Sequence, residues 1–311
     1  MKLKRRIYDM KISMNISSLF AKYSKDERIK CMKLCKEAGF DAVDFSLCEM
    51  IDDASEFNGD DYREIAMSYR KAADDMGLVI NQTHTPFNFK NWKDEAHYNS
   101  VIYPRMIRSL EISAILGAEI AVVHPLHYDE YHGREEEWFE RNMEFYRSLI
   151  PYCKEYGLKC GVENMWRYDT LRKYITHDTC SRKEEFIRYI DTLNSEYMVG
   201  CLDVGHVGLP MQDDGAHDFV RALGHDRLRS LHIHDNDYRG DQHSLPYVGK
   251  MNWEELARAL GEIDYSGDFT YELNGSFFST MDDAFAPVAL RYTYDVAKHI
   301  VDMIEENRPK N

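Results

Sequence analysis

The chain has 311 residues, of which 44% are hydrophobic and 30% are charged, and this ordinary globular composition excludes a disordered protein. Its 39 basic and 54 acidic residues give a net charge of −15, which disfavours nonspecific binding to nucleic acid. Seven scattered cysteines, an odd number, are typical of a reducing compartment and predict a cytoplasmic protein. No apolar run reaches about 18 residues, so no membrane partner is expected. No apolar segment follows the basic N-terminus, so no signal peptide is expected.

Short apolar runs alternate with helix-like segments along the whole chain. Strands are predicted near residues 11–17, 40–47, 78–84, 119–124, 158–164, 198–204, 229–235 and 268–274. Helices are predicted near residues 25–38, 60–76, 96–116, 135–156, 182–193, 216–223, 252–261 and 281–305. Eight such βα units favour a single (β/α)₈ TIM barrel, and we expect one domain over residues 1–311.

Glycines stand at the expected helix ends. Gly39, Gly77, Gly117, Gly157 and Gly267 come just before predicted strands, a position typical of the glycine that caps the preceding helix. No glycine-rich loop follows the first predicted strand, which disfavours a nucleotide-binding protein.

Six predicted strands end in residues that bind metals or move protons. They are His84, His124, Glu163, Asp203, His234 and Glu272. Burial of a carboxylate or an imidazole is costly unless the group is paired or bound to a metal. Because the carboxyl ends of barrel strands meet at one mouth, we predict a single polar site there.

Four of these residues make a candidate metal site. Glu163, Asp203, His234 and Glu272 end the last four strands. Three carboxylates and one imidazole favour Mn²⁺, Mg²⁺ or Co²⁺, and Zn²⁺ stays open. A cation would also relieve the repulsion that otherwise raises the pKa of clustered carboxylates. Strand alternation puts His232 on the same face as His234 but deeper, so it is expected behind the ligands.

Other polar and aromatic residues extend this site. His84, His124, His206, Asp241 and His243 are predicted to bind substrate or additional metal. Phe87 and Trp166 are predicted to line a small-molecule pocket, and Trp92 and Phe277 are weighed for the same role.

Short motifs around these residues resemble a known family. They are His84-Thr85-Pro86-Phe87, Val123-His124-Pro125, Val162-Glu163-Asn164-Met165, Leu202-Asp203-Val204-Gly205-His206, His234-Asp235-Asn236-Asp237, Asp241-Gln242-His243 and Tyr271-Glu272-Leu273. They resemble the xylose-isomerase-like TIM barrels, which include sugar phosphate isomerases and epimerases, ketose 3-epimerases, inosose dehydratases and endonuclease-four-type enzymes. The resemblance covers predicted strands three to eight.

The epimerase branch of this family implies a mechanism. One divalent metal is held at the positions of Glu163, Asp203, His234 and Glu272 and polarises the carbonyl of a ketose. The two glutamates then remove and return a proton at the adjacent carbon, from opposite sides, and the residue matching His206 contacts the substrate.

Two positions depart from the ketose 3-epimerase pattern. Asp169 stands where that branch carries a further glutamate, six residues after the first metal glutamate. Gly240, with Arg239 beside it, stands where that branch carries an arginine. The predicted function is therefore the broader one: a divalent-metal-dependent isomerase or epimerase of a sugar or sugar phosphate, acting by proton transfer next to a metal-bound carbonyl.

Three other functions stay open. One is an inosose dehydratase-like enzyme or another carbohydrate lyase. A second is a multi-zinc phosphodiesterase of the endonuclease-four type, whose nine ligands match His84, His124, Glu163, Asp203, His206, His234, Asp241, His243 and Glu272. The acidic stretches after predicted strands two and three, which hold only two lysines, disfavour that reading and a nucleic-acid partner. A third is a barrel that binds metal or sugar without catalysis. The oligomeric state is also open, and a homo-oligomer is one option.

Overall fold

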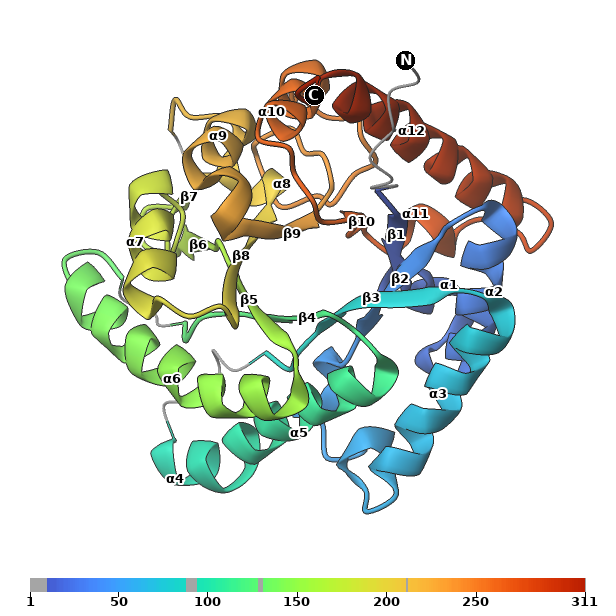
Figure 1. Ribbon diagram of the computed structural model, residues 1–311, viewed down its shortest axis with the longest axis horizontal. Helices are drawn as coiled ribbons and strands as arrows, with labels where there is room; N and C mark the ends of the chain where they lie inside the picture. Colours follow the sequence, from blue (N-terminus) through green and yellow to red (C-terminus); the bar gives the residue numbers. More distant parts are fainter. Residues whose placement is uncertain (1–9, 88–93, 128–130, 211, 311) are drawn as a thin grey trace.

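The computed structural model describes residues 10–87, 94–127, 131–210 and 212–310. Eight parallel strands form a ring at the centre of the molecule, with helices around it (Figure 1). The strands are β1 (Ile12–Asn15), β2 (Ala42–Ser46), β3 (Val79–His84), β4 (Ile120–Val123), β5 (Lys159–Glu163), β8 (Met198–Asp203), β9 (Leu228–His232) and β10 (Phe269–Tyr271). A parallel bridge between Ile233 and Tyr271 joins β9 to β10 and closes the ring. The predicted strands and the TIM barrel are confirmed.

The outer ring confirms the eight predicted helices. They are α2 (Arg28–Ala38), α3 (Tyr62–Met76), α5 (Tyr103–Leu116), α6 (Glu135–Tyr156), α7 (Lys183–Leu193), α9 (Ala216–Arg227), α10 (Trp253–Glu262) and α12 (Ala286–Glu306). Shorter helical segments are η1 (Ile16–Leu19), α1 (Phe20–Tyr23), η2 (Lys25–Glu27), η3 (Cys48–Ile51), η4 (Glu56–Asn58), α4 (Glu95–His97), η5 (Tyr98–Ile102), α8 (Val204–Val207) and α11 (Ser276–Ser279). Within the described ranges, no helix combines the length and the apolar character that crossing a membrane requires.

Four of the five predicted cap glycines end helices as expected. Gly39, Gly77, Gly117 and Gly157 have φ values between 61° and 113°, a left-handed conformation that suits glycine. The prediction for Gly267 is wrong, because α10 ends at Glu262 and Gly267 lies in the loop that follows. There a Cβ atom would lie 2.4 Å from the carbonyl oxygen of Arg229, so close backbone approach, not capping, explains this glycine.

Hydrogen-bonded polar side chains fill part of the barrel interior below the mouth. Ser13 Oγ donates to Asn81 Oδ1 at 2.8 Å, and Asn81 Nδ2 donates to Thr270 Oγ1 at 3.1 Å. Gln82 Nε2 donates to Asp44 Oδ2 at 3.0 Å. The fully buried carboxylate Asp44 lies among these groups, and its Oδ2 accepts from Gln82 while its Oδ1 has no hydrogen bond of good geometry to the described residues.

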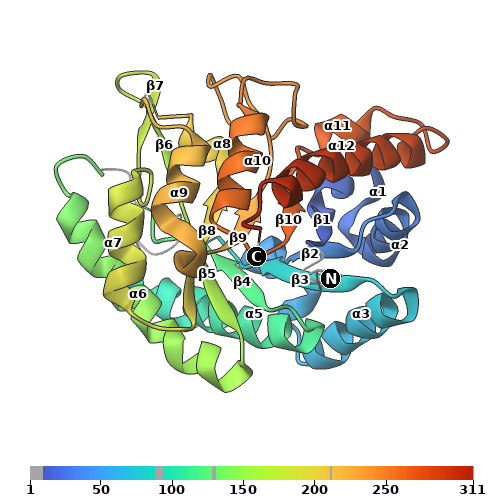
Figure 2. The ribbon, with the colours of Figure 1, turned by 45° about the horizontal axis from the view of Figure 1, so that its top comes forward.

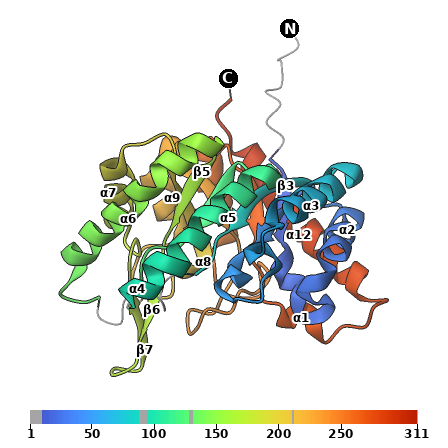
Figure 3. The same ribbon diagram turned by 90° about the horizontal axis from the view of Figure 1, so that it is seen from below.

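A hairpin that the sequence reading did not predict follows β5. Its strands β6 (Trp166–Asp169) and β7 (Tyr174–His177) pair antiparallel. The hairpin projects from the barrel on the side opposite the C-terminus (Figures 2 and 3). It therefore extends the wall of the mouth where the strands' carboxyl ends lie.

Candidate active site

All six strand-end residues meet at one mouth of the barrel. His84, Glu163 and Asp203 end β3, β5 and β8, while His124, His234 and Glu272 lie one or two residues beyond β4, β9 and β10. The described residues contain three groups whose ligand atoms lie within 4.8 Å of one another. These are His84 with Glu163, His232 and Glu272; His206 with His234, Asp241 and His243; and Glu163 with Asp203 and His206.

Glu163 is the centre of the first group. Its Oε1 lies 2.9 Å from His232 Nδ1, and its Oε2 lies 2.7 Å from His124 Nε2. His84 Nε2 is 3.3 Å from His124 Nε2, and Glu272 Oε2 is 3.3 Å from His232 Nδ1. Burial alone would raise the pKa of Glu163, but His232 and His124 hold that pKa well below its ordinary value. Glu163 is therefore an ionised carboxylate at neutral pH.

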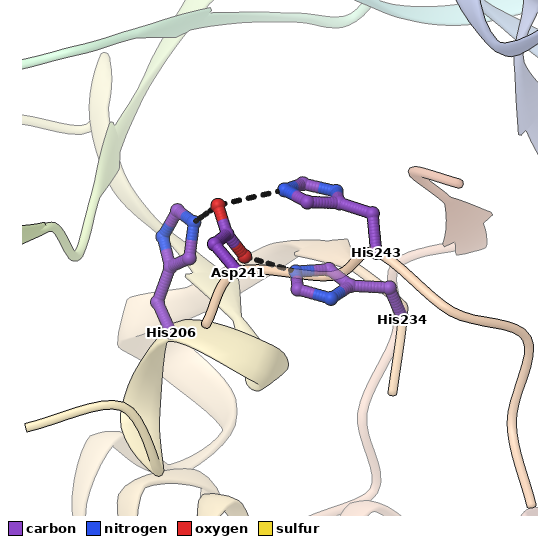
Figure 4. Close-up of side chains that lie close together, drawn as sticks. All are labelled: His206, His234, Asp241 and His243. Atoms are coloured by element: carbon purple, nitrogen blue, oxygen red, sulfur yellow. Dashed lines mark hydrogen bonds and ion pairs between the residues drawn. The ribbon is translucent and has the colours of Figure 1, made fainter. Parts of the chain in front are cut away.

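The second group surrounds Asp241, which reaches toward three imidazoles (Figure 4). Asp241 Oδ2 is 2.9 Å from His243 Nε2 and 3.4 Å from His206 Nε2, and Asp241 Oδ1 is 3.9 Å from His234 Nε2. The rings of His234 and His243 stack with centroids 3.8 Å apart. Burial lowers the pKa of His243, but the hydrogen bond to Asp241 and the negative charges of Glu272, Asp241 and Asp203 together raise that pKa to about 9.

Asp203 joins the two groups. It shares a group with Glu163 and His206, and His234 Nε2 lies 2.9 and 3.0 Å from its two oxygens. The four predicted ligands therefore lie at one mouth but are divided among the three groups: Glu163 is grouped with Glu272 and with Asp203, while His234 contacts Asp203. Asn164 holds this arrangement, since its side chain pairs with the backbone N–H and carbonyl of Asp203 at 2.8 and 2.9 Å.

Asp44 supports the first group from below. Its Oδ2 lies 3.6 Å from His84 Nδ1 and 3.8 Å from His232 Nε2, on the sides of both rings that face away from Glu163. Amide donors of Gln82 and Asn15 hold this carboxylate at 3.0 and 3.4 Å. At these distances the contact is electrostatic, and it favours ring orientations in which the opposite nitrogens of His84 and His232 face Glu163.

The residues at the mouth fit a divalent cation. Among the described residues, Glu163 Oε2, His234 Nδ1 and Asp241 Oδ1 are buried without a hydrogen bond of good geometry. Buried polar atoms are nearly always paired. Carboxylate oxygens and imidazole nitrogens aimed at one another are a donor set that a divalent cation satisfies.

A cavity of about 890 Å³ opens in front of these groups. Phe87 and Trp166 lie in its wall, and Trp166 Nε1 donates to Asp241 Oδ2 at 3.2 Å. Phe277 packs against the hydrophobic core and is not among the residues that line the cavity. Trp92 lies outside the described residues.

The sequence reading missed the outer part of this cavity. Tyr131 and the β6–β7 hairpin, including Arg167 and Tyr168, line it. Buried Asp178 lies behind the hairpin, 3.2 Å from Arg167 Nη2 and 2.8 Å from His127 Nδ1. The alternating polar and aromatic residues of 166–169 are the signal that could have revealed the first strand of this hairpin.

Comparison with known sequences gives a family match over most of the chain. Residues 32–286 match the family described as xylose isomerase-like TIM barrel. A D-psicose 3-epimerase of Enterocloster bolteae is 25% identical over 245 residues, which cover 76% of this chain and 74% of that one. An uncharacterized protein of Sinorhizobium fredii is 25% identical over 166 residues, and the match spans 52% of this chain and only 50% of that relative.

Solved structures share the fold over nearly the whole chain. A crystal structure of D-psicose 3-epimerase in the presence of D-fructose has a TM-score of 0.72 and 18% identity, and covers 94% of this chain and 99% of that one. The IOLI protein with a binding zinc atom has a TM-score of 0.70 and 17% identity, and covers 97% and 100% of the two chains. At these identities the likeness establishes the fold.

Proposed function

Because this chain belongs to the xylose isomerase-like TIM barrel family, we propose that it is a divalent-metal-dependent sugar isomerase or epimerase. Glu163 and Glu272 carry this proposal, because both line the same cavity and both lie beside His232. A pair of carboxylates facing one cavity suits removal of a proton and its return. The curated D-psicose 3-epimerase relative supports the same class of reaction. We also propose that residues 1–311 form one domain.

The proposed cation ligands are Glu163, Asp203, His234 and Glu272. Their oxygen-rich set favours Mn²⁺, Mg²⁺ or Co²⁺, and the zinc in the structurally similar IOLI protein keeps Zn²⁺ open. When bound, the cation supplies a Lewis acid that polarises the sugar carbonyl and acidifies the adjacent C–H.

The protein's own residues transfer the proton, contact the substrate and line the cavity. Glu163 is held ionised by His124 and His232, so its carboxylate is ready to accept a proton from the carbon next to the carbonyl. The Glu272 side chain is 21% exposed and reaches the cavity, so it can return a proton there. His206 lines the cavity and is placed to contact substrate hydroxyls. The aromatic walls at Phe87 and Trp166 exclude water from the reacting carbon.

The residue at position 169 does not specify which sugar carbon reacts. Asp169, at the position of the further glutamate in ketose 3-epimerases, lines the cavity but pairs with Arg172 at 2.6 Å. Its shorter side chain is engaged outside the cation groups. We therefore propose the general isomerase or epimerase reaction, with a carbohydrate lyase as the runner-up.

One experiment tests this proposal. The purified protein is analysed for bound metal and then incubated in deuterated water with ketoses, ketose phosphates and inososes. We expect deuterium next to the carbonyl of at least one sugar, together with an isomerised or epimerised product. Bound metal with no exchange on any sugar would contradict the proposed reaction.

A second candidate is a multi-metal phosphodiesterase. It is favoured by one observation, that all nine residues matching the endonuclease-four-type ligands gather at the same mouth. It is opposed by the net charge of −15, since duplex-binding enzymes need many cationic contacts to phosphates.

A further inference from the structure

We propose that the outer part of the cavity is a second sugar subsite, and that the substrate is an uncharged glycoside or oligosaccharide ending in a keto sugar. This inference rests on the proposed function, because it extends the same active site. Among the described residues, the subsite is formed by Tyr131, Arg167 and Tyr168, with Thr170 and Leu171 at the hairpin tip.

The size of the cavity is the first observation. Its volume of about 890 Å³ is near the upper end of the range of about 300–1,000 Å³ that encloses drug-sized ligands. A single keto sugar is much smaller than such a ligand. A sugar held at Glu163 and Glu272 would leave the space beside the hairpin to a second group.

The lining of this space suits a sugar ring. Trp166, the first residue of β6, lines the cavity and donates its Nε1–H to Asp241. Tyr131 and Tyr168 also line the cavity. Aromatic faces pack against the apolar C–H faces of a sugar, so these rings suit a sugar bound beside the hairpin.

Arg167 supplies unused hydrogen-bond donors. Its side chain is only 7% exposed, yet Nε and Nη2 make no hydrogen bond of good geometry to the described residues. Asp178 Oδ2 lies 3.2 Å from Nη2 but also makes no hydrogen bond of good geometry. A buried guanidinium N–H without a hydrogen bond of good geometry is costly, so a neighbouring sugar hydroxyl is the group expected to accept from Arg167, which lines the cavity.

Charge favours a neutral group over a phosphate. Arg167 is neutralised by Asp178, and Arg172 is neutralised by Asp169 at 2.6 Å. The hairpin therefore offers no unpaired guanidinium to a phosphate dianion. Binding a phosphate here would require one of these ion pairs to break.

The test compares four probes that share a fructose unit. The metal-loaded protein is titrated calorimetrically with fructose, with fructose 6-phosphate, and with the glucosyl and galactosyl derivatives isomaltulose and lactulose. We expect at least one of the two disaccharides to bind about tenfold more tightly than fructose, and fructose 6-phosphate to bind no more tightly than fructose.

Two matched variants locate the subsite. Tyr168, which is 49% exposed on β6, tolerates truncation, and Tyr168→Ala should remove the advantage of the disaccharide while leaving fructose binding unchanged. Tyr174→Ala is the control, because Tyr174 lies on the partner strand at 43% exposure and does not line the cavity. Arg167→Gln should act in the same direction as Tyr168→Ala.

The outcomes separate this inference from the proposed function. Tighter binding of fructose 6-phosphate, equal binding of fructose and both disaccharides, or equal losses for all probes in Tyr168→Ala would overturn the subsite. Deuterium exchange on fructose would still support the isomerase or epimerase in that case. Tight disaccharide binding without deuterium exchange on any sugar would support the second subsite and contradict the proposed isomerase or epimerase reaction.

Discussion

Glu163 Oε2 lies 2.7 Å from His124 Nε2, and both groups are buried at the mouth of the barrel. This contact and the one to His232 hold the pKa of Glu163 well below its ordinary value, although burial alone would raise it. His232 in turn lies 3.8 Å from Asp44, deeper in the barrel, so the site depends on a carboxylate that does not line the cavity.

Asp44→Asn should weaken metal binding. The carboxylate of Asp44 lies behind His232, which contacts the proposed ligands Glu163 and Glu272. Because Asp44 acts on the ligands through His232, the loss of affinity should be at or below the about 10–100-fold typical of direct supports of a metal ligand. Competition with a chelator of known affinity measures the change. Asp60→Asn, at an exposed position between η4 and α3, is the control and should bind metal like the wild type. Equal affinities for Asp44→Asn and the wild type would show that the carboxylate does not act on the ligands through His232.

Metal binding should release protons at neutral pH. Burial lowers the pKa of His243, but the hydrogen bond to Asp241 and the negative charges of Glu272, Asp241 and Asp203 together raise it to about 9, so His243 is protonated at pH 7 in the metal-free protein. Its ring stacks on that of the proposed ligand His234 with centroids 3.8 Å apart, so a cation bound there would repel this proton, and metal affinity should rise with pH until about 9 and fall as the pH drops. Calorimetry in two buffers with different ionisation enthalpies counts the protons released. Binding with no proton release at pH 7 would contradict this expectation.

Glu185→Gln should stabilise the protein in alkaline solution. Burial raises the pKa of Glu185 from 4.5 to about 7, against a hydrogen bond from Tyr131. Because the folded-state pKa is the higher one, this group stabilises the fold below pH 4.5, and the stabilisation is lost as pH rises through 7. The glutamine stays neutral, so its melting temperature should exceed that of the wild type by roughly 2–6 °C at pH 8 and match it near pH 4.5.

Glu184→Gln is the control for that comparison. Glu184 neighbours Glu185 on α7, but its side chain is 73% exposed. Its substitution should change the melting temperature little at either pH. A Glu185→Gln difference that is the same at pH 4.5 and pH 8 would show that the carboxyl does not titrate in this interval.

The protein should not nick abasic duplex DNA at physiological salt. The net charge of −15 repels the phosphate backbone, and any residual binding should fall steeply as salt rises. A gel assay with zinc-loaded protein measures nicking. Efficient cleavage would favour the multi-metal phosphodiesterase, in which the same nine residues act as ligands.

The sequence was enough to predict the barrel and the gathering of its polar residues. Strand-length apolar runs and glycines such as Gly77 mark each βα unit, and parallel connections bring residues as distant as His84 and Glu272 to one mouth. These features follow from local pattern and from topology alone.

The grouping of side chains within the mouth could not be predicted in this way. His232 and His234 share a face by alternation, but only the structure shows that His232 contacts Glu163 while His234 contacts Asp203. The role of Asp44 depends on where β2 lies relative to β3 and β9, which the sequence of β2 does not specify. The β6–β7 hairpin was missed because its strands, Trp-Arg-Tyr-Asp and Tyr-Ile-Thr-His, are not apolar runs like those of the barrel strands.

Solvent-deuterium incorporation reports proton transfer by Glu163 and Glu272 most directly. Wild type, Glu163→Gln and Glu272→Gln are each loaded with metal, their metal content is measured, and exchange into recovered sugar is followed. Wild type should incorporate deuterium at the carbon next to the carbonyl, and each variant should be slower by about 10²–10⁴-fold, the usual contribution of a positioned acid or base. Exchange at the wild-type rate in either variant, with metal still bound, would contradict the two-glutamate mechanism.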